Sequence, residues 1–421
     1  MSHPILSHLA ETLIGSEIVK LGNAIRQRIA QGETIYNFTI GDFDPSIFPI
    51  PAELETLIID AYKNHQTSYP AAEGEMELRK AISHFIKTKE GIDYGVDEIQ
   101  VASGGRPLIY TIFRAIVDIG DKVIYAVPSW NNNHYAHMTD SEHCLIDATP
   151  ENNFMPTAAD IAPHVKGATL ICLCTPQNPT GTTLTKDALA EICQLILDQN
   201  TSRGADEKKL YLMFDQMYWT LTYGEIEHYN PITLFPEMKA YTIFVDGISK
   251  AFAATGVRVG WSLGPAFIIT KMKAILSHLG AWAPMAEQKA VAQYLYQTEA
   301  IDQYLANFKS ELQYRLHNIY EGIMKLKSQG HSVDAVTPQA AIYLTVRFEL
   351  TGRTTADGTL LNTQEDVTNY LLSEAKLAIV PFYCFGADHT NAWYRLSVGT
   401  CKKEQIGAML DHLGAALYKL S

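Results

Sequence analysis

Residues 243–261 read IFVDGISKAFAATGVRVGW, and this stretch guides the interpretation of the whole chain. Its apolar start predicts a buried strand, after which Lys250 stands among small and apolar residues. Burial disfavours the ammonium form of a lysine, so Lys250 can be neutral near pH 7 and attack an aldehyde. Arg258, eight positions later, offers a fixed cation for a phosphate. The alternative is that Lys250 extends to solvent from a loop between a strand and a helix.

Pyridoxal 5′-phosphate carries both an aldehyde and a phosphate, and it is therefore the cofactor that Lys250 and Arg258 suggest. A second candidate phosphate site is the turn ASGGRP at 102–107. Its glycines let the backbone approach a ligand, and the amides at the start of the following helix can bind an anion. The two glycine-rich nucleotide-binding signatures are absent from this turn, and the alternative is an ordinary strand-to-helix connection.

Length and composition predict a globular protein with two domains. The chain has 421 residues, of which 47% are hydrophobic and 19% charged. Its net charge of −13 argues against a general surface for nucleic acid or anionic membranes. The six cysteines form no CxxC pair, and we interpret them as reduced, buried thiols. Neither a signal peptide nor an apolar run of about 20 residues is evident, so a cytoplasmic location is expected.

Short apolar runs alternate with helical patterns between residues 99 and 262, which predicts an α/β fold with a mainly parallel sheet flanked by helices. The predicted strands are 99–102, 122–126, 170–174, 211–214, 241–245 and 259–263. An earlier short strand is predicted at 35–40, and runs at 341–347, 377–380 and 393–398 suggest a small α+β domain. We predict an N-terminal arm with part of the small domain at 1–50, a large cofactor-binding domain at 51–304 and a small C-terminal domain at 305–421.

Two candidate ligand residues follow predicted strands, at the edge of the sheet where α/β folds bind ligands. Trp130 can stack on a planar ring, although a tryptophan is more often a packing residue. Asn178 stands in TPQNPTG at 175–181, where two prolines and a glycine make a rigid turn that can direct the amide toward a ligand oxygen. The alternative for Asn178 is a structural loop in which it caps its own turn.

Three more candidates carry charge or a hydroxyl. Asp215 ends a predicted buried strand and needs a partner there, which a protonated pyridine nitrogen would provide. Tyr218 is close enough in sequence to reach a hydroxyl on the same ring. The alternative for Asp215 is the N-cap of a helix. Arg395 lies in a late strand, where its guanidinium suits a carboxylate, and the alternative is a surface arginine on an edge strand.

No metal site is predicted. The three histidines His134, His137 and His143 lie close together, but no acidic or cysteine partner stands at a recognisable spacing. Asp42 and Asp44 resemble the start of a calcium loop that lacks its glycine and its closing glutamate.

Taken together, these segments resemble the class I/II aminotransferases, an aspartate-aminotransferase-like family of the fold type I pyridoxal-phosphate-dependent enzymes. The resemblance extends from about residue 35 to about residue 400 and includes the order and spacing of the motifs. It implies the PLP-dependent transferase fold, with a mainly parallel seven-stranded sheet in a large domain and a smaller α+β domain. It also implies transfer of an amino group between an L-amino acid and a 2-oxo acid by a ping-pong mechanism, with aspartate as a candidate donor.

The resemblance assigns roles around the cofactor ring. Lys250 matches the Schiff-base lysine, which also acts as the general base. Asp215 and Tyr218 match the partners of the ring nitrogen and the ring hydroxyl, and we count both among the catalytic residues. Asn178 matches the residue that bonds the ring oxygen, and Trp130 matches the aromatic residue that stacks on the ring.

The resemblance also assigns the phosphate site. Arg258 matches the residue that binds the phosphate, and Gly105 and Arg106 match the backbone amides that cradle it. Ser249, beside Lys250, is counted among the cofactor-binding residues. Tyr69 matches a tyrosine that reaches the phosphate of the partner subunit, so a homodimer with shared sites is expected.

Arg395 and the Gly41 backbone match the groups that hold the substrate carboxylate, with Trp130 and Asn178 beside it. We expect Trp282 and Tyr343 to line the pocket. Arg106 stands where some aspartate aminotransferases carry a lysine that meets the distal carboxylate, although it could equally point to solvent.

Two residues depart from the family pattern and touch the phosphate site. Gly247 replaces a serine that some members use on the phosphate, and Pro107 cannot donate an amide. Other PLP enzymes of the same fold, namely a β-lyase, a decarboxylase or an acyltransferase, remain alternatives, as does a non-enzymatic PLP-binding regulator. Arg395 argues against decarboxylation because it would clamp the carboxylate, and the chain shows no basic N-terminal module of the kind that regulators append.

Overall fold

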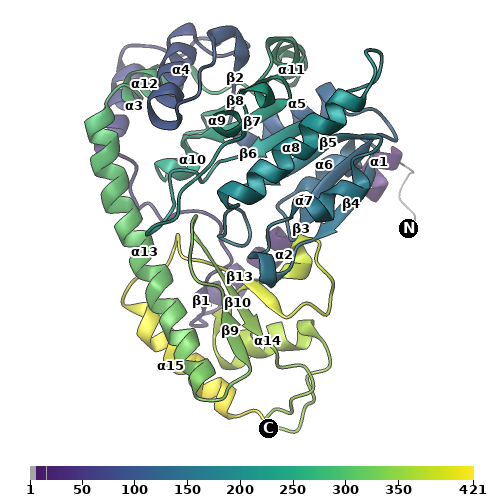
Figure 1. Cartoon of the computed structure of the whole chain (residues 1–421). Helices are drawn as coiled ribbons and strands as arrows, with labels where there is room; N and C mark the ends of the chain where they lie inside the picture. Colours follow the sequence, from purple (N-terminus) through teal and green to yellow (C-terminus); the bar gives the residue numbers. More distant parts are fainter. Residues whose placement is uncertain (1–5, 16) are drawn as a thin grey trace.

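A sheet of seven strands organises the larger part of the molecule (Figure 1). The computed structural model describes residues 6–15 and 17–421. The strands are ordered β2-β8-β7-β6-β5-β3-β4, and all neighbours are parallel except β8, which runs antiparallel to β2 and β7. Their bounds are β2 (Ile99–Ala102), β3 (Lys122–Val127), β4 (Glu142–Asp147), β5 (Ala168–Cys174), β6 (Tyr211–Asp215), β7 (Thr242–Gly247) and β8 (Gly260–Leu263). The mainly parallel seven-stranded sheet confirms the predicted fold class.

Six of the seven strands coincide with predicted apolar runs, and β4 is the one that was missed. Only Cys144 and Ile146 are buried in β4, and its sequence EHCLID has only three consecutive apolar residues between charged or polar ones. The predicted strand at 35–40 is shorter than expected, because only β1 (Tyr36–Asn37) pairs, in parallel, with β11 (Leu377–Ala378).

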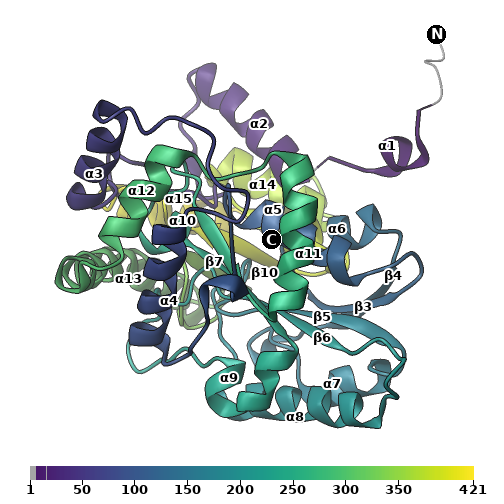
Figure 2. The ribbon, with the colours of Figure 1, turned by 90° about the horizontal axis from the view of Figure 1, so that it is seen from above.

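Helices cover both faces of the large sheet, as Figure 2 shows from above. The side chains of β3 and β5 alternate between two apolar cores, which lie on opposite faces. One face packs against α5 (Gly105–Ile116), α6 (Asn132–Met138) and α11 (Ala266–Leu279). The other packs against α3 (Ala52–Lys63), α4 (Met76–Glu90), α7 (Ala158–Ile161), α8 (Lys186–Ser202) and α12 (Met285–Tyr294). A parallel sheet buried on both faces leaves the ends of its strands as the place for a ligand.

A smaller antiparallel sheet follows in the order β12-β13-β10-β9. Its bounds and those of its helices are β9 (Val333–Ala335), β10 (Tyr343–Phe348), β12 (Val380–Pro381), β13 (Trp393–Ser397), α13 (Thr298–Ser328), α14 (Gln364–Glu374) and α15 (Gln405–Tyr418). The long helix α13 runs past both sheets (Figure 1). Its Ile301 packs in the core of the large sheet and its Phe308 in that of the small one. The domain boundary predicted at residue 305 falls inside this helix and stays a prediction.

The N-terminal segment contributes α1 (His8–Thr12) and α2 (Glu17–Ala30). The Thr12 hydroxyl lies 2.9 Å from His137 Nε2 on α6, and Ile25 of α2 packs on Leu372 and Ala378. The remaining short helices are α9 (Pro231–Leu234), α10 (Ile248–Ala251) and 3-10 helices at Val96–Glu98, Pro150–Asn152, Ala162–His164, Pro236–Ala240 and Phe382–Phe385.

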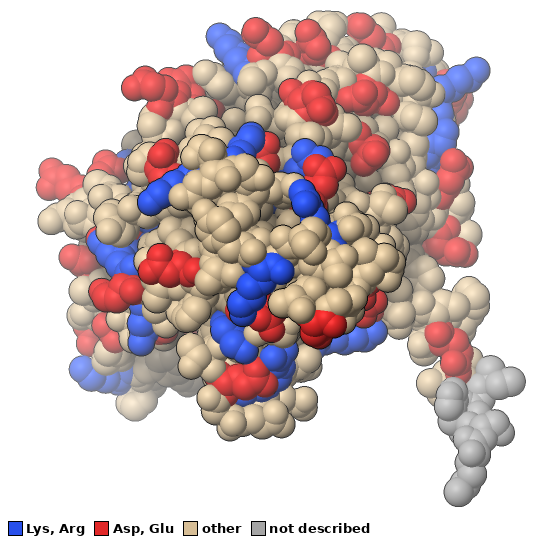
Figure 3. Space-filling view, turned by 90° about the horizontal axis from the view of Figure 1, so that it is seen from below, with Lys and Arg blue, Asp and Glu red and all other residues tan. Residues whose placement is uncertain are grey.

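Basic and acidic side chains are mixed on the face seen from below (Figure 3). No helix within residues 6–15 and 17–421 is long and apolar enough to cross a membrane. The cytoplasmic location stays a prediction.

Candidate active site

A cavity of about 460 Å³ lies where β5, β6 and β7 end and where the small sheet meets the large one. It brings together every predicted site residue except Tyr69 and Trp282. Those that line it are Gly41, Gly105, Arg106, Trp130, Asn178, Asp215, Tyr218, Ser249, Lys250, Arg258 and Arg395. The roles of these residues stay predictions. The structure nevertheless brings them together from segments up to 354 residues apart in the sequence.

Lys250 faces this cavity rather than the outer surface. It belongs to α10, which begins directly after β7, and its Nζ donates to the Gly41 carbonyl oxygen at 2.7 Å. Burial lowers the pKa of Lys250 to about 8, Asp42 opposes this shift, and the nearby arginines, led by Arg395, add to it. A substantial fraction of this amine is therefore neutral near pH 8 and can act as a nucleophile or a base.

Three glycines allow the turns around Lys250 to approach one another. A Cβ on Gly247 would lie 2.8 Å from Gly260 Cα and 2.9 Å from Val259 O. A Cβ on Gly260 would lie 2.8 Å from the carbonyl carbon of Gly104, and one on Gly104 would collide with the Arg258 guanidinium. The close packing of β7 on β8 therefore explains glycine at position 247, since a serine there would push the two strands apart.

Arg258 is fixed beside the start of α5. Its φ is +61°, and its Nη1 and Nη2 donate to the carbonyl oxygens of Thr255 at 2.8 Å and Ser103 at 2.7 Å. The first amides of α5, beginning at Gly105, have no partner within the helix. Pro107 is the third residue of α5, where a missing N–H removes no helical hydrogen bond. The site thus combines a guanidinium with a helix N-terminus, which suits a phosphate.

Asp215 ends β6 with its carboxyl at the cavity. Burial raises the pKa of Asp215 to about 6, and the Met217 amide, which donates to Oδ1 at 3.1 Å, opposes the shift. Residues 217–220 form a turn, so the alternative of a helix N-cap is wrong. Tyr218 follows in this turn, and its hydroxyl shares a 2.6 Å hydrogen bond with that of Tyr343. This partly buried carboxyl group, whose pKa is raised, would be stabilised in its ionised form by a cation on a ligand.

Arg395 lies in β13, between β12 and β10, and only 1% of it is exposed. The alternative of a surface arginine on an edge strand is therefore wrong. Its Nη1 donates to Asn178 Oδ1 at 3.1 Å and its Nη2 to Thr39 O at 2.7 Å, whereas its Nε is buried without a partner among the described residues. Asn178 thus orients the guanidinium instead of capping its own turn.

Other lining residues went unnoticed in the sequence. Thr255 donates its hydroxyl to Asp42 Oδ1 at 2.6 Å, and both residues line the cavity. Arg26 of α2 also lines it, together with Arg106, whose guanidinium lies 5.2 Å from the centre of the Trp130 ring. Both arginines therefore add positive charge to the lining of the cavity.

Tyr69 lies outside the cavity, and 87% of it is exposed. Its ring packs edge-on against Trp282, with 5.7 Å between the ring centres. The expectation that Trp282 lines the cavity of its own chain is therefore wrong, whereas Tyr343 does line it.

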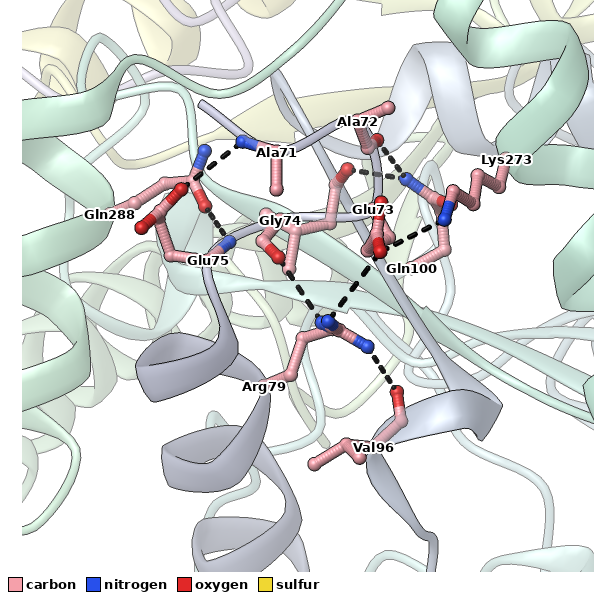
Figure 4. A network of polar contacts seen from close by, with 11 residues as sticks. Ala71, Ala72, Glu73, Gly74, Glu75, Arg79, Val96, Gln100, Lys273 and Gln288 are labelled. Carbon is pink, nitrogen blue, oxygen red and sulfur yellow. Dashed lines mark hydrogen bonds and ion pairs between the residues drawn. The ribbon is translucent and has the colours of Figure 1, made fainter. Parts of the chain in front are cut away.

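The segment after Tyr69 is held by the polar network of Figure 4. Three of its hydrogen bonds run from Arg79 Nε to Gly74 O (3.1 Å), from Gln100 Nε2 to Ala72 O (3.0 Å) and from the Glu75 amide to Gln288 Oε1 (2.8 Å). Lys273 and Arg79 both pair with the Glu73 carboxylate. A segment fixed in this way presents the Tyr69 ring outward as part of a formed surface.

Two of the three histidines that could have suggested a metal, His137 and His143, have other partners. His143 Nδ1 lies 2.8 Å from the Tyr125 hydroxyl, and His137 contacts Thr12. Across the residues that the structure describes, no group of three or more His, Cys, Asp or Glu side chains is arranged to hold a metal ion.

Comparisons with known proteins place this geometry in a family. The model described as aminotransferase class I and II matches residues 33–413. An aspartate aminotransferase of Bacillus sp. (strain YM-2) is 28% identical over 389 residues, covering 92% of this chain and 93% of the relative. One from Rhizobium meliloti (strain 1021) is 27% identical over 409 residues, covering 96% and 94%. Among solved structures, the aspartate aminotransferase from Rhizobium meliloti superposes with a TM-score of 0.90 at 25% identity, covering 100% of both chains.

Proposed function

The chain belongs to the class I and II aminotransferases and transfers an amino group between an L-amino acid and a 2-oxo acid, and on this premise we propose that it works with pyridoxal 5′-phosphate bound at Lys250. The observation that carries the proposal is the partly buried Lys250 amine, which shares one cavity with an acid, Asp215, and two arginines, Arg258 and Arg395. These groups match an aldehyde, a ring nitrogen, a phosphate and a substrate carboxylate in turn.

The residues present fit this cofactor. Asp215 is a buried acid with a raised pKa, and it would pair with the protonated ring nitrogen. Arg258, Ser249 and the first amides of α5 would hold the phosphate. Tyr218 and Asn178 would bond the ring oxygen, and Trp130 would stack on the ring. When bound, the cofactor supplies an aldehyde carbon and a ring that withdraws electrons from the substrate.

The chain itself holds the substrate and moves its proton. Arg395 would bind the substrate carboxylate, because it is desolvated and its buried Nε is free to donate. The Gly41 backbone lies beside it, within reach of Lys250. Once released by the incoming amine, Lys250 would act as the general base at the substrate Cα, which its pKa of about 8 permits.

We propose aspartate as an amino donor. The relatives from Bacillus sp. and Rhizobium meliloti are aspartate aminotransferases, and the cavity is lined by Arg106, which lies next to Trp130. A guanidinium there would attract a second carboxylate and favour dicarboxylic substrates.

A screen of amino donors against 2-oxoglutarate and pyruvate tests the proposal. We expect aspartate to give the highest kcat/KM, and Arg106→Ala to reduce it for aspartate but not for alanine. Aspartate ranking no better than alanine or phenylalanine would defeat the dicarboxylate proposal. Lys250→Ala should abolish turnover and Asp215→Ala should lose most of the rate, so an active Lys250→Ala enzyme would defeat the proposal as a whole.

We further propose a homodimer in which Tyr69 completes the site of the partner. Its ring is exposed, belongs to a fixed segment and lies outside the cavity of its own chain. Tyr62 and Met76, which flank this segment in sequence, are also about half exposed, at 50% and 45%. An apolar face of this kind suits a second copy of the chain.

Mixed dimers test the shared site. Lys250→Ala and Tyr69→Ala subunits are each expected to be impaired alone. A dimer of the two would contain one site with both native residues, so mixing after mild dissociation should restore activity. A mixture no more active than the sum of its parts, under conditions where subunits exchange, would contradict the placement of Tyr69.

A further inference from the structure

Asp246 is a buried acid just behind the cavity. It is the penultimate residue of β7, four positions before Lys250, and only 1% of it is exposed. Its Oδ1 accepts the amide of Gly247 at 2.7 Å, and its Oδ2 accepts the indole N–H of Trp219 at 3.0 Å. One carboxylate thus satisfies two donors, one at the end of β7 and one in the turn after β6.

The two donors belong to the two turns that carry the predicted chemistry. Gly247 opens the turn into α10, which holds Lys250. Trp219 lies in the turn after β6, just beyond Asp215 and Tyr218. The backbone pairing of β6 with β7 ends at Asp215, and a last backbone bond runs from the amide of the next residue to Val245 O at 3.0 Å. The bridge through Asp246 therefore continues the connection past the point where the strands stop pairing.

The same turn is also held by Glu90, at the end of α4. Gln216 Nε2 donates to both carboxylate oxygens of Glu90, at 2.8 and 2.9 Å. His228 Nε2 lies 3.3 Å from Gln216 Oε1, and the Trp219 ring packs near Phe85 of α4. With the turn after β6 held in this way, the Asp246 bridge sets the distance between that turn and the turn that carries Lys250.

We propose that Asp246 is a positioning residue for the aminotransferase reaction: by bonding Trp219 and Gly247 together, it fixes Lys250 relative to Asp215. The inference rests on the proposed roles of Lys250 and Asp215. Burial raises the pKa of Asp246 to about 7, and both N–H donors oppose that shift, as expected for an acid held in place by donors. Removal of the carboxylate would leave two buried donors unpaired and free the turns to separate.

Kinetics of the holoenzyme provide the first test. Misplacement by about 1 Å can cost about a hundredfold in rate, so Asp246→Ala should lower kcat by about 10- to 100-fold. The KM for the amino donor should change by less than about threefold, because Arg395 and the carboxylate site are not displaced. Asp246→Asn keeps one acceptor oxygen, so its kcat should lie between that of the native protein and that of Asp246→Ala. Trp219→Phe should also lower kcat. In the double variant the loss of kcat should be smaller than the product of the two single losses, because both changes break the same bridge.

A second readout does not depend on turnover. Competitive labelling of Lys250 across pH in the cofactor-free protein reports the pKa of its amine. Asp246→Ala should move the midpoint upward from about pH 8, because a displaced turn exposes the amine. The matched control is Asp334→Ala in β9, which also removes a carboxylate that accepts the amide of the next residue, at 2.9 Å. This control should leave both readouts unchanged.

Two results would overturn the inference: a kcat for Asp246→Ala within about twofold of the native value, or effects of Asp246→Ala and Trp219→Phe that multiply. If Asp246→Ala does not fold, Asp246→Asn and Trp219→Phe decide the question in the same way. An active Lys250→Ala enzyme would instead defeat the proposed function, so the two failures are distinguishable.

Discussion

Replacement of Asp215 by asparagine should make the cofactor-free protein more stable while it destroys activity. Burial raises the pKa of Asp215 from 3.8 to about 6, and each pKa unit corresponds to about 1.4 kcal/mol. The ionised carboxylate therefore costs the folded protein at most about 3 kcal/mol, an upper limit because the side chain is partly open to the cavity. Asparagine carries no charge and removes this cost, but it cannot pair with a ring cation.

The pH dependence of this stability difference follows from the direction of the Asp215 pKa shift. Because the folded-state pKa lies above the unfolded one, the contribution of Asp215 to stability is fully present below about pH 4 and is lost as pH rises through about 6. The advantage of Asp215→Asn should therefore be absent at about pH 4, grow up to about pH 6 and stay constant above it.

Thermal unfolding of the two cofactor-free proteins measures this difference. For a chain of 421 residues, 3 kcal/mol corresponds to a rise in Tm of about 3 °C at about pH 8. The exposed Asp206 provides the control, and Asp206→Asn should show no such pH-dependent gain. An Asp215→Asn protein that is no more stable at about pH 8, or equally more stable at about pH 4, would refute the reasoning from burial.

Three further predictions concern the same site. Gly247→Ala places a Cβ 2.8 Å from Gly260 Cα, so it should destabilise the protein by about 1 to 3 kcal/mol, whereas Gly256→Ala, with no neighbour within 4 Å, should not; equal effects in unfolding experiments would count against the close approach. Arg395→Lys loses bidentate binding and should raise the KM for the amino acid about 10- to 100-fold, which steady-state kinetics would show; an unchanged KM would remove Arg395 from the carboxylate site. Competitive labelling should give Lys250 a midpoint near pH 8 in the cofactor-free protein, and a midpoint near that of a free lysine, about 10.4, would mean that the amine is solvated.

The sequence was most informative where chemistry is local. Apolar runs predicted six of the seven strands of the large sheet, but the edge strand β4 alternates exposed and buried residues and has only three consecutive apolar residues between polar ones. Lys250 and Asp215 were recognisable because each lies at or just after the end of a buried strand, where a charged group needs a partner.

Contacts between distant segments could not be predicted in this way. The Thr255–Asp42 hydrogen bond joins residues 213 apart, and the Tyr218–Tyr343 pair joins residues 125 apart. Trp282 was expected in the cavity, but the fold turns it toward Tyr69.

The covalent attachment of the cofactor is the most direct test of the proposed function. The protein would be incubated with pyridoxal 5′-phosphate, reduced with borohydride, digested and analysed by mass spectrometry, with Lys250→Ala treated in parallel. We predict a single stoichiometric phosphopyridoxyl group on the peptide that contains Lys250 and none in the variant. A protein that takes up no label, or that carries it on another lysine, would contradict the assignment.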